Sequence, residues 1–158
     1  MRKSLFAGLL AVCLVMFFSS LTLLAADNWL GTWILNTAKS QYNPGPGPKS
    51  QTLKFEISQD AITVQADGVN TGGKSSHGSY TSRFDGKDVP WTGNPDADTA
   101  SPRRIDANSY ENAWKKDGKV TINSKAVVSD DGKTLTVTQK GRNVRGETVD
   151  TTAVFDRQ

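Results

Sequence analysis

The sequence predicts an all-β domain of antiparallel strands joined by short turns. The tripeptide Asp-Gly-Lys, which favours tight turns between twisted strands, occurs at residues 85–87, 117–119 and 131–133. The segments between such turns alternate apolar and polar residues, as in Leu53, Phe55 and Ile57, which is the period of a strand with one buried face. After residue 26, no segment has the length and 3.6-residue period of a long helix.

Further turn signals divide the chain into ten predicted strands. Gly-Gly-Lys at 72–74, Arg-Gly-Glu at 145–147 and polar clusters at 93–96 and 106–108 supply the remaining turns. The predicted strands cover residues 29–36, 51–58, 62–69, 74–84, 87–93, 99–106, 109–116, 119–128, 133–140 and 147–156. The widest connection, 36–50, contains Pro44-Gly45-Pro46-Gly47-Pro48, so it acts as a flap or crossover and not as a central strand.

An up-and-down meander of about eight to ten strands has two ways to bury one apolar face. It closes into a barrel, which removes the exposed sheet edges, or it folds over as a β-sandwich. We favour the closed barrel because closure leaves no exposed edge, and we keep the sandwich as the alternative.

Residues 1–26 have the composition of a secretory signal peptide. Arg2 and Lys3 precede an apolar run from Leu5 to Leu24 that ends at Ala25-Ala26. We therefore expect an exported protein, periplasmic or secreted, whose single domain spans 27–158 and which has no integral membrane association after cleavage. The alternative is an uncleaved anchor, since about 20 apolar residues suffice to cross a bilayer as a helix.

The charge balance argues against a nucleic-acid partner. The whole chain carries 19 basic and 16 acidic residues, and without Arg2 and Lys3 the excess of positive charge falls to one. So small an excess supplies no general attraction for a polyanion. The only cysteine, Cys13, lies in the signal segment, so we expect a domain without disulfides.

The first predicted strand contains Gly31-Thr32-Trp33, which resembles the Gly-x-Trp signature of the lipocalin and fatty-acid-binding superfamily, the calycins. That resemblance implies a closed barrel in which Trp33 packs across one end and an arginine from the last strand, Arg157 by position, covers its ring. The chain departs from the fatty-acid-binding pattern in two respects. It has a Pro-Gly flap in place of a helical pair, and it lacks an Arg-x-Tyr motif near the C-terminus.

A second resemblance covers most of the predicted domain. The chain is similar to a group of small exported bacterial proteins of no established function in the segments 31–36, 44–52, 80–90, 92–99 and 129–134. This resemblance implies a lipocalin-like barrel and export, and it implies no activity.

Nothing in the sequence points to catalysis or to a cofactor. His77 is the only histidine, and the serines beside it are neighbours in one predicted strand, which does not make a catalytic triad. Asp96 and Asp98 lack the further oxygen ligands of a calcium loop. We therefore expect no enzyme, no metal site and no cofactor.

The predicted inward face mixes aromatic with polar side chains. Alternation along the strands places these aromatic and polar residues on the same face as the apolar residues Ile57, Val120 and Ile122. A buried polar group without a partner costs about 1–3 kcal/mol, so a dry filled barrel would seldom contain so many. We predict a ligand cavity lined by Trp33, Tyr80, Ser82, Trp91, Asn112, Trp114, Ser124 and Gln139.

The resulting functional expectation is a small apolar or amphiphilic ligand bound inside a lipocalin-like barrel. The alternative is a module of the cell envelope that contacts another macromolecule through its outer face or its flap, with the barrel merely filled. A bulge in any strand would move some of the predicted lining residues to the outer face.

Overall fold

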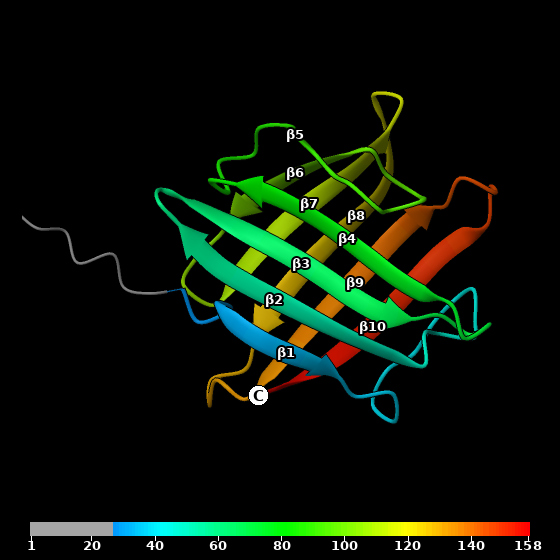
Figure 1. Cartoon of the computed structure of the whole chain (residues 1–158), viewed down its shortest axis with the longest axis horizontal. Coiled ribbons are helices and arrows are strands. Elements are labelled where there is room, and N and C mark those ends of the chain that lie inside the picture. Colours follow the sequence, from blue (N-terminus) through cyan, green and yellow to red (C-terminus); the bar gives the residue numbers. More distant parts are fainter. Residues whose placement is uncertain (1–26) are drawn as a thin grey trace, which may run out of the picture.

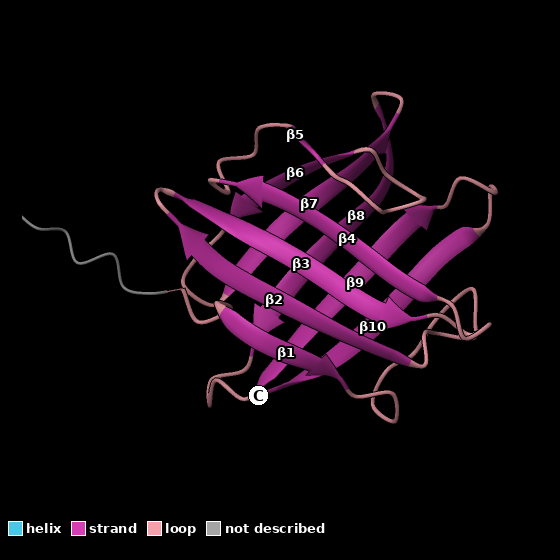
Figure 2. Ribbon diagram, viewed as in Figure 1, coloured by secondary structure: helices cyan, strands magenta, loops and turns pink. Residues whose placement is uncertain are grey.

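The computed structural model describes residues 27–158, which form one antiparallel sheet of ten strands curled into a nearly closed barrel (Figures 1 and 2). The predicted signal peptide lies outside the described residues. No helix among those residues is long and apolar enough to cross a membrane. The strands are β1 (Gly31–Leu35), β2 (Ser50–Ser58), β3 (Ala61–Val69), β4 (Ser75–Ser82), β5 (Val89–Pro90), β6 (Thr99–Arg104), β7 (Ser109–Lys116), β8 (Lys119–Val128), β9 (Thr134–Arg142) and β10 (Thr148–Arg157).

The order of strands confirms the up-and-down barrel. It runs β4-β3-β2-β1-β10-β9-β8-β7-β6-β5, so the first strand pairs with the last and every other pairing joins sequence neighbours. The sheet closes beside its two edge strands, β4 and β5, where Ser79 of β4 and Thr92, two residues after β5, exchange two backbone hydrogen bonds of 3.0 Å. This bridge is the seam of the barrel.

The predicted strand 87–93 is wrong in length, because β5 contains only Val89 and Pro90. Asp85-Gly86 does not form a tight turn between paired strands. It lies in the connection between β4 and β5, where Asp85 forms a bridge with Arg103 and the Gly86 N–H donates to Pro102 O on β6 at 2.9 Å. Asp117-Gly118 does form the predicted two-residue turn, because both residues have positive φ, 49° and 75°.

Two side chains predicted to face inward lie at the surface. Val120 is 52 % exposed because the pairing of β7 with β8 slips by one residue: Trp114 lies opposite Ile122, but Lys115 lies opposite Val120. This bulge turns Val120 outward while Ile122 stays buried. Ile57, at the end of β2, is 63 % exposed.

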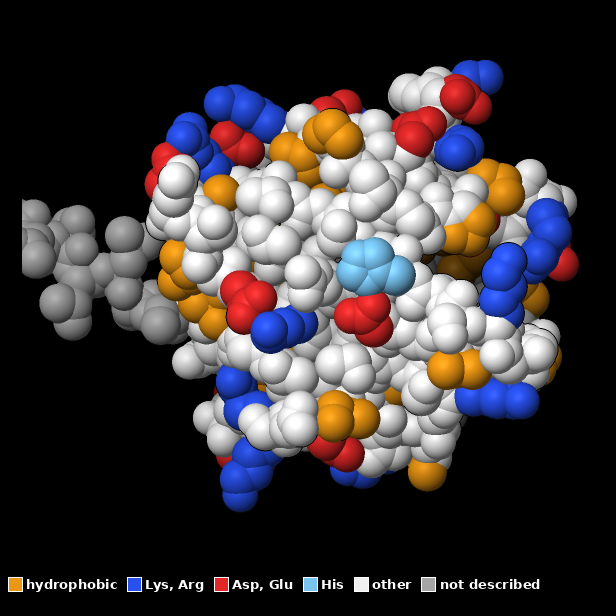
Figure 3. Space-filling model, in the orientation of Figure 1, with side chains coloured by type: hydrophobic (Ala, Val, Ile, Leu, Met, Phe, Trp, Pro, Cys, Tyr) orange, Lys and Arg blue, Asp and Glu red, His pale blue; other side chains and the backbone are white. Residues whose placement is uncertain are grey.

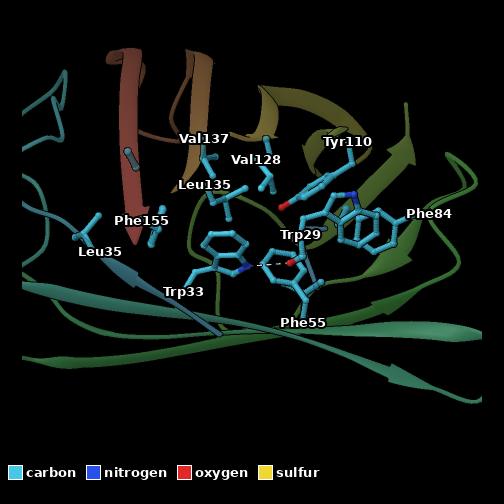
Figure 4. Packing of buried hydrophobic residues seen from close by; sticks show 14 of the residues in the cluster. Trp29, Trp33, Leu35, Phe55, Phe84, Tyr110, Val128, Leu135, Val137 and Phe155 are labelled. Atoms are coloured by element: carbon cyan, nitrogen blue, oxygen red, sulfur yellow. Dashed lines mark hydrogen bonds between the residues drawn. The ribbon is translucent and has the colours of Figure 1, made fainter. Parts of the chain in front are cut away.

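One end of the barrel is closed by aromatic packing (Figure 4). Trp29 and Trp33 are fully buried, and the Trp33 Nε1–H donates to Trp29 O at 2.9 Å. The Trp29 ring stacks on Phe84 at 4.8 Å between centroids and meets Tyr110 edge to face at 5.2 Å. Burying side chains of this size dominates the energetics of a core, so this end carries much of the stability of the barrel.

Arg157 covers the closed end from outside. Its guanidinium carbon lies 4.1 Å from the centroid of the Trp33 ring, as the Gly-x-Trp resemblance implies. The same guanidinium donates to the carbonyl oxygens of Gly132, Leu30 and Asn28. Gly31 has φ +112°, and a Cβ there would lie 3.1 Å from Arg157 Nη1, so glycine suits both the backbone and the space.

Candidate ligand cavity

Above the closed end, the barrel holds a cavity of about 230 Å³. Strands β2, β3, β4, β7, β8, β9 and β10 all contribute to its wall. Its lining residues are Tyr42, Gln51, Leu53, Phe55, Val64, Ala66, Ser76, His77, Gly78, Tyr80, Trp91, Gly93, Asn94, Pro95, Tyr110, Asn112, Trp114, Ser124, Val137, Gln139, Ala153 and Phe155. Figure 3 shows hydrophobic side chains recessed below the surface beside His77.

The flap brings a tyrosine to the cavity. Residues 41–43 pair with the part of β10 that the short β1 leaves uncovered: Gln41 and Thr152 exchange two backbone hydrogen bonds of 2.8 Å. The ring of Tyr42 lies against Gly47, where a Cβ would come within 2.2 Å of it. The flap therefore holds Tyr42 against the cavity through a backbone pairing and a glycine contact.

One side of the wall is aromatic. Trp91 meets Trp114 edge to face at 4.9 Å between ring centroids and meets Tyr80 edge to face at 5.1 Å. The backbone N–H of Trp91 donates to Asp98 O at 2.8 Å, which holds the residue beside the seam. The rest of the wall, from β2, β3, β9 and β10, is largely aliphatic, with Leu53, Val64 and Val137 among its members.

The side-chain amide of Asn112 makes a hydrogen bond within the protein through its oxygen atom. Its Oδ1 accepts from the backbone N–H of Ser101 at 2.9 Å, which fixes the orientation of the amide and leaves the Nδ2 amino group as its second polar end. Ser124 Oγ donates to Asn112 O at 3.3 Å. These bonds explain how both polar residues are tolerated inside the barrel.

The phenols that line the cavity are neutral. Burial raises the pKa of Tyr80 well above its ordinary value, and the neighbouring Tyr110 phenol raises it further. Burial also raises the pKa of Tyr110 and of Tyr42. Each hydroxyl therefore keeps its proton at neutral pH and remains a hydrogen-bond donor.

No lysine, arginine, aspartate or glutamate lines the cavity. His77 reaches it from β4, and its Nδ1 lies 2.5 Å from Asp67 Oδ1 on neighbouring β3, with more than half of each side chain exposed. No group of three or more metal-ligating side chains occurs within residues 27–158.

Six of the eight residues predicted to bind a ligand line this cavity: Tyr80, Trp91, Asn112, Trp114, Ser124 and Gln139. The other two do not. Trp33 is part of the closed end, where its indole bonds to Trp29 O. Ser82 is buried, and its Oγ accepts from the Phe84 N–H at 3.0 Å, which uses the hydroxyl to hold the turn after β4.

Two lining residues, Tyr42 and Tyr110, were not among the residues predicted from the sequence to bind a ligand. Tyr42 belongs to the Pro-Gly flap, where strand alternation gives no information about orientation. Tyr110 has the same parity as Asn112 and Trp114, so the alternation of β7 was sufficient to place it on the lining.

Comparison of the sequence with models of known protein families gives no match, and comparison with curated proteins gives none either. Among solved structures, the protein is similar to three fluorescence-activating or redesigned β-barrels. They are EF1p2_mFAP2b bound to DFHBI (10% identity over 83% of this chain and 94% of that one, TM-score 0.47), a de novo designed fluorescence-activating barrel (12%, 85% and 97%, 0.42) and the redesigned barrel mFAP1 bound to DFHBI (14%, 84% and 98%, 0.42).

The fold and the cavity define the class of this protein. It is an antiparallel, up-and-down β-barrel of ten strands with one closed end and an internal cavity. Identities of 10–14% do not indicate what such a barrel binds.

Proposed function

We propose that this protein is an exported, non-enzymatic, lipocalin-like barrel that binds a small apolar or amphiphilic molecule in its cavity. The observation that carries the proposal is the interior space of about 230 Å³ walled by aromatic, aliphatic and neutral polar side chains. Binding sites for small molecules are typically concave and mostly apolar, with a few polar groups that orient the ligand. The envelope-module alternative assumed a filled barrel, and the interior cavity favours ligand binding over that alternative.

The size of the cavity limits the ligand. An engineered apolar cavity of about 150 Å³ is large enough for benzene, whereas sites for drug-sized ligands begin at about 300 Å³. A space of about 230 Å³ lies between these values. We therefore expect a ligand of roughly one or two rings, or an aliphatic molecule of similar volume.

Calorimetric titration of the purified protein with a panel of fatty acids, quinones, isoprenoids and small aromatic compounds tests the proposal. We expect saturable binding of at least one class, with about one molecule per barrel. Ala66→Phe places a ring in the cavity and is expected to abolish that binding. Lys115→Ala is the matched control, because Lys115 bonds to Asp88 on the outer face.

The absence of saturable binding for every class, or equal binding by wild type and Ala66→Phe, would contradict an interior site. Native mass spectrometry of the protein purified from its own source provides an independent check, since a retained ligand appears as an added mass.

A further inference from the structure

We infer that the cavity takes an uncharged, planar aromatic molecule of one or two rings whose hydrogen-bond acceptor meets the hydroxyls of Tyr80 and Tyr110. This inference rests on the proposed function and specifies its ligand. It excludes fatty acids and other carboxylates as the ligands of this site.

The charge of the ligand follows from the lining. Moving an ion from water into a low-dielectric site is costly unless an opposite charge or several hydrogen bonds compensate it. The 22 lining residues include no lysine or arginine to pair with an anion and no carboxylate to pair with a cation. The one histidine among the lining residues, His77, already has Asp67 as its partner on the outer face. A neutral molecule avoids this desolvation cost.

The shape of the ligand follows from the aromatic wall. Tyr80, Trp91 and Trp114 form a chain of edge-to-face contacts at 5.1 and 4.9 Å, and Tyr110 lies on the floor below them. Aromatic rings prefer such edge-to-face and offset arrangements, which stabilise a pair beyond the effect of buried area. A planar aromatic ligand extends this set of contacts, whereas a flexible chain loses conformational freedom on binding and gains no ring contact.

The position of the polar group follows from the two buried phenols. Tyr80 and Tyr110 come from β4 and β7, line the same cavity, and both pack against Phe84, at 6.4 and 5.1 Å between ring centroids. Both remain protonated at neutral pH, so both are donors. A carbonyl oxygen has two lone pairs, so one such oxygen can accept from both hydroxyls.

Four small probes separate these requirements in calorimetric titrations. Coumarin is neutral, planar and bicyclic, and carries a carbonyl; coumarin-3-carboxylate adds a negative charge; naphthalene removes the acceptor; and octanoate replaces the rings by a charged chain. We expect one coumarin per barrel, affinity at least tenfold weaker for coumarin-3-carboxylate, and no saturable binding of octanoate. Equal affinity for the two coumarins, or tighter binding of octanoate, would overturn the inference while leaving an interior site in place.

The phenols are tested by removing single oxygen atoms. Tyr80→Phe and Tyr110→Phe are each expected to weaken coumarin binding about three- to tenfold, the range for one neutral hydrogen bond, and to leave naphthalene binding unchanged. Thr81→Val, on the outward-facing side of β4, is the matched control. Equal losses of affinity for coumarin and naphthalene would mean that the phenols act through packing. That result would overturn the inference that their hydroxyls donate to the ligand. If none of the four probes, nor any compound of the wider panel, bound saturably, the proposed function itself would fail.

Discussion

Stacking of Arg157 on Trp33 is expected to couple the two residues energetically across the closed end of the barrel. Trp33 is fully buried and its indole donates to Trp29 O, so Trp33→Ala removes a large core side chain and leaves a buried acceptor unpaired. Such a change costs about 3–5 kcal/mol. Since a single domain is stable by only about 5–15 kcal/mol, this loss is a large part of the total.

A double-mutant cycle isolates the stacking from the loss of volume. Trp33→Leu keeps part of the buried volume, and Arg157→Met keeps the aliphatic stem but removes the guanidinium. The guanidinium lies 4.1 Å from the ring centroid and is partly solvated, so we expect a coupling of about 0.5–1 kcal/mol, at the low end for cation–π pairs.

Urea unfolding of the four proteins, followed by far-ultraviolet circular dichroism, measures the coupling. The three carbonyl bonds of Arg157 are lost in both backgrounds and therefore cancel in the cycle. If the losses of unfolding free energy in the two single variants add up to the loss in the double variant within about 0.3 kcal/mol, Arg157 covers the Trp33 ring without stabilising it.

Three further predictions concern the turn at Gly118, the loss of stability at low pH and the predicted signal peptide. Gly118→Ala is expected to cost about 1–2 kcal/mol in urea unfolding, because φ is +75° there and no atom of another residue lies within 4 Å of the new Cβ, so that steric conflict contributes nothing. The denaturation midpoint is expected to fall as pH drops from about 5 to 3, because hydrogen bonds from Lys115 lower the pKa of Asp88 and those from Ser129 lower the pKa of Asp131. The unfolded chain then binds more protons than the folded one, so a midpoint that rises on acidification would contradict this. N-terminal sequencing of the exported protein is expected to begin at Ala26 or Asp27, and a start at Met1 would refute cleavage.

Alternation of apolar and polar residues was sufficient to predict most of the barrel. The strands β7, β8 and β2 lie within one residue of their predicted bounds. The prediction was accurate there because short turns fix the register of neighbouring strands and one buried face fixes the parity. The same parity placed Tyr80, Asn112 and Gln139 on the cavity wall.

The errors arise where the structure depends on contacts between distant parts of the chain. At the bulge that exposes Val120, the Thr121 hydroxyl donates to Asp96 O at 2.9 Å, a contact that no local pattern reveals. Asp85-Gly86 has the composition of a hairpin turn, but its amide pairs with β6. The assignment of Trp33 to a ligand site failed because strand parity does not show at which level of the barrel an inward side chain lies.

The seam of the barrel depends on two positions that have no side chain. At Gly93 a Cβ would lie 1.9 Å from His77 O, and at Gly78 it would lie 3.2 Å from Thr92 O, so the two backbones touch where any other residue would separate them. A methyl group at Gly93 would therefore push the two backbones of the seam apart, and Gly93 takes part in none of the pairings between the other neighbouring strands. The close approach at the seam thus depends on two glycines, whereas the closed end depends on the packing of Trp29 and Trp33, so a substitution at the seam leaves that aromatic packing in place.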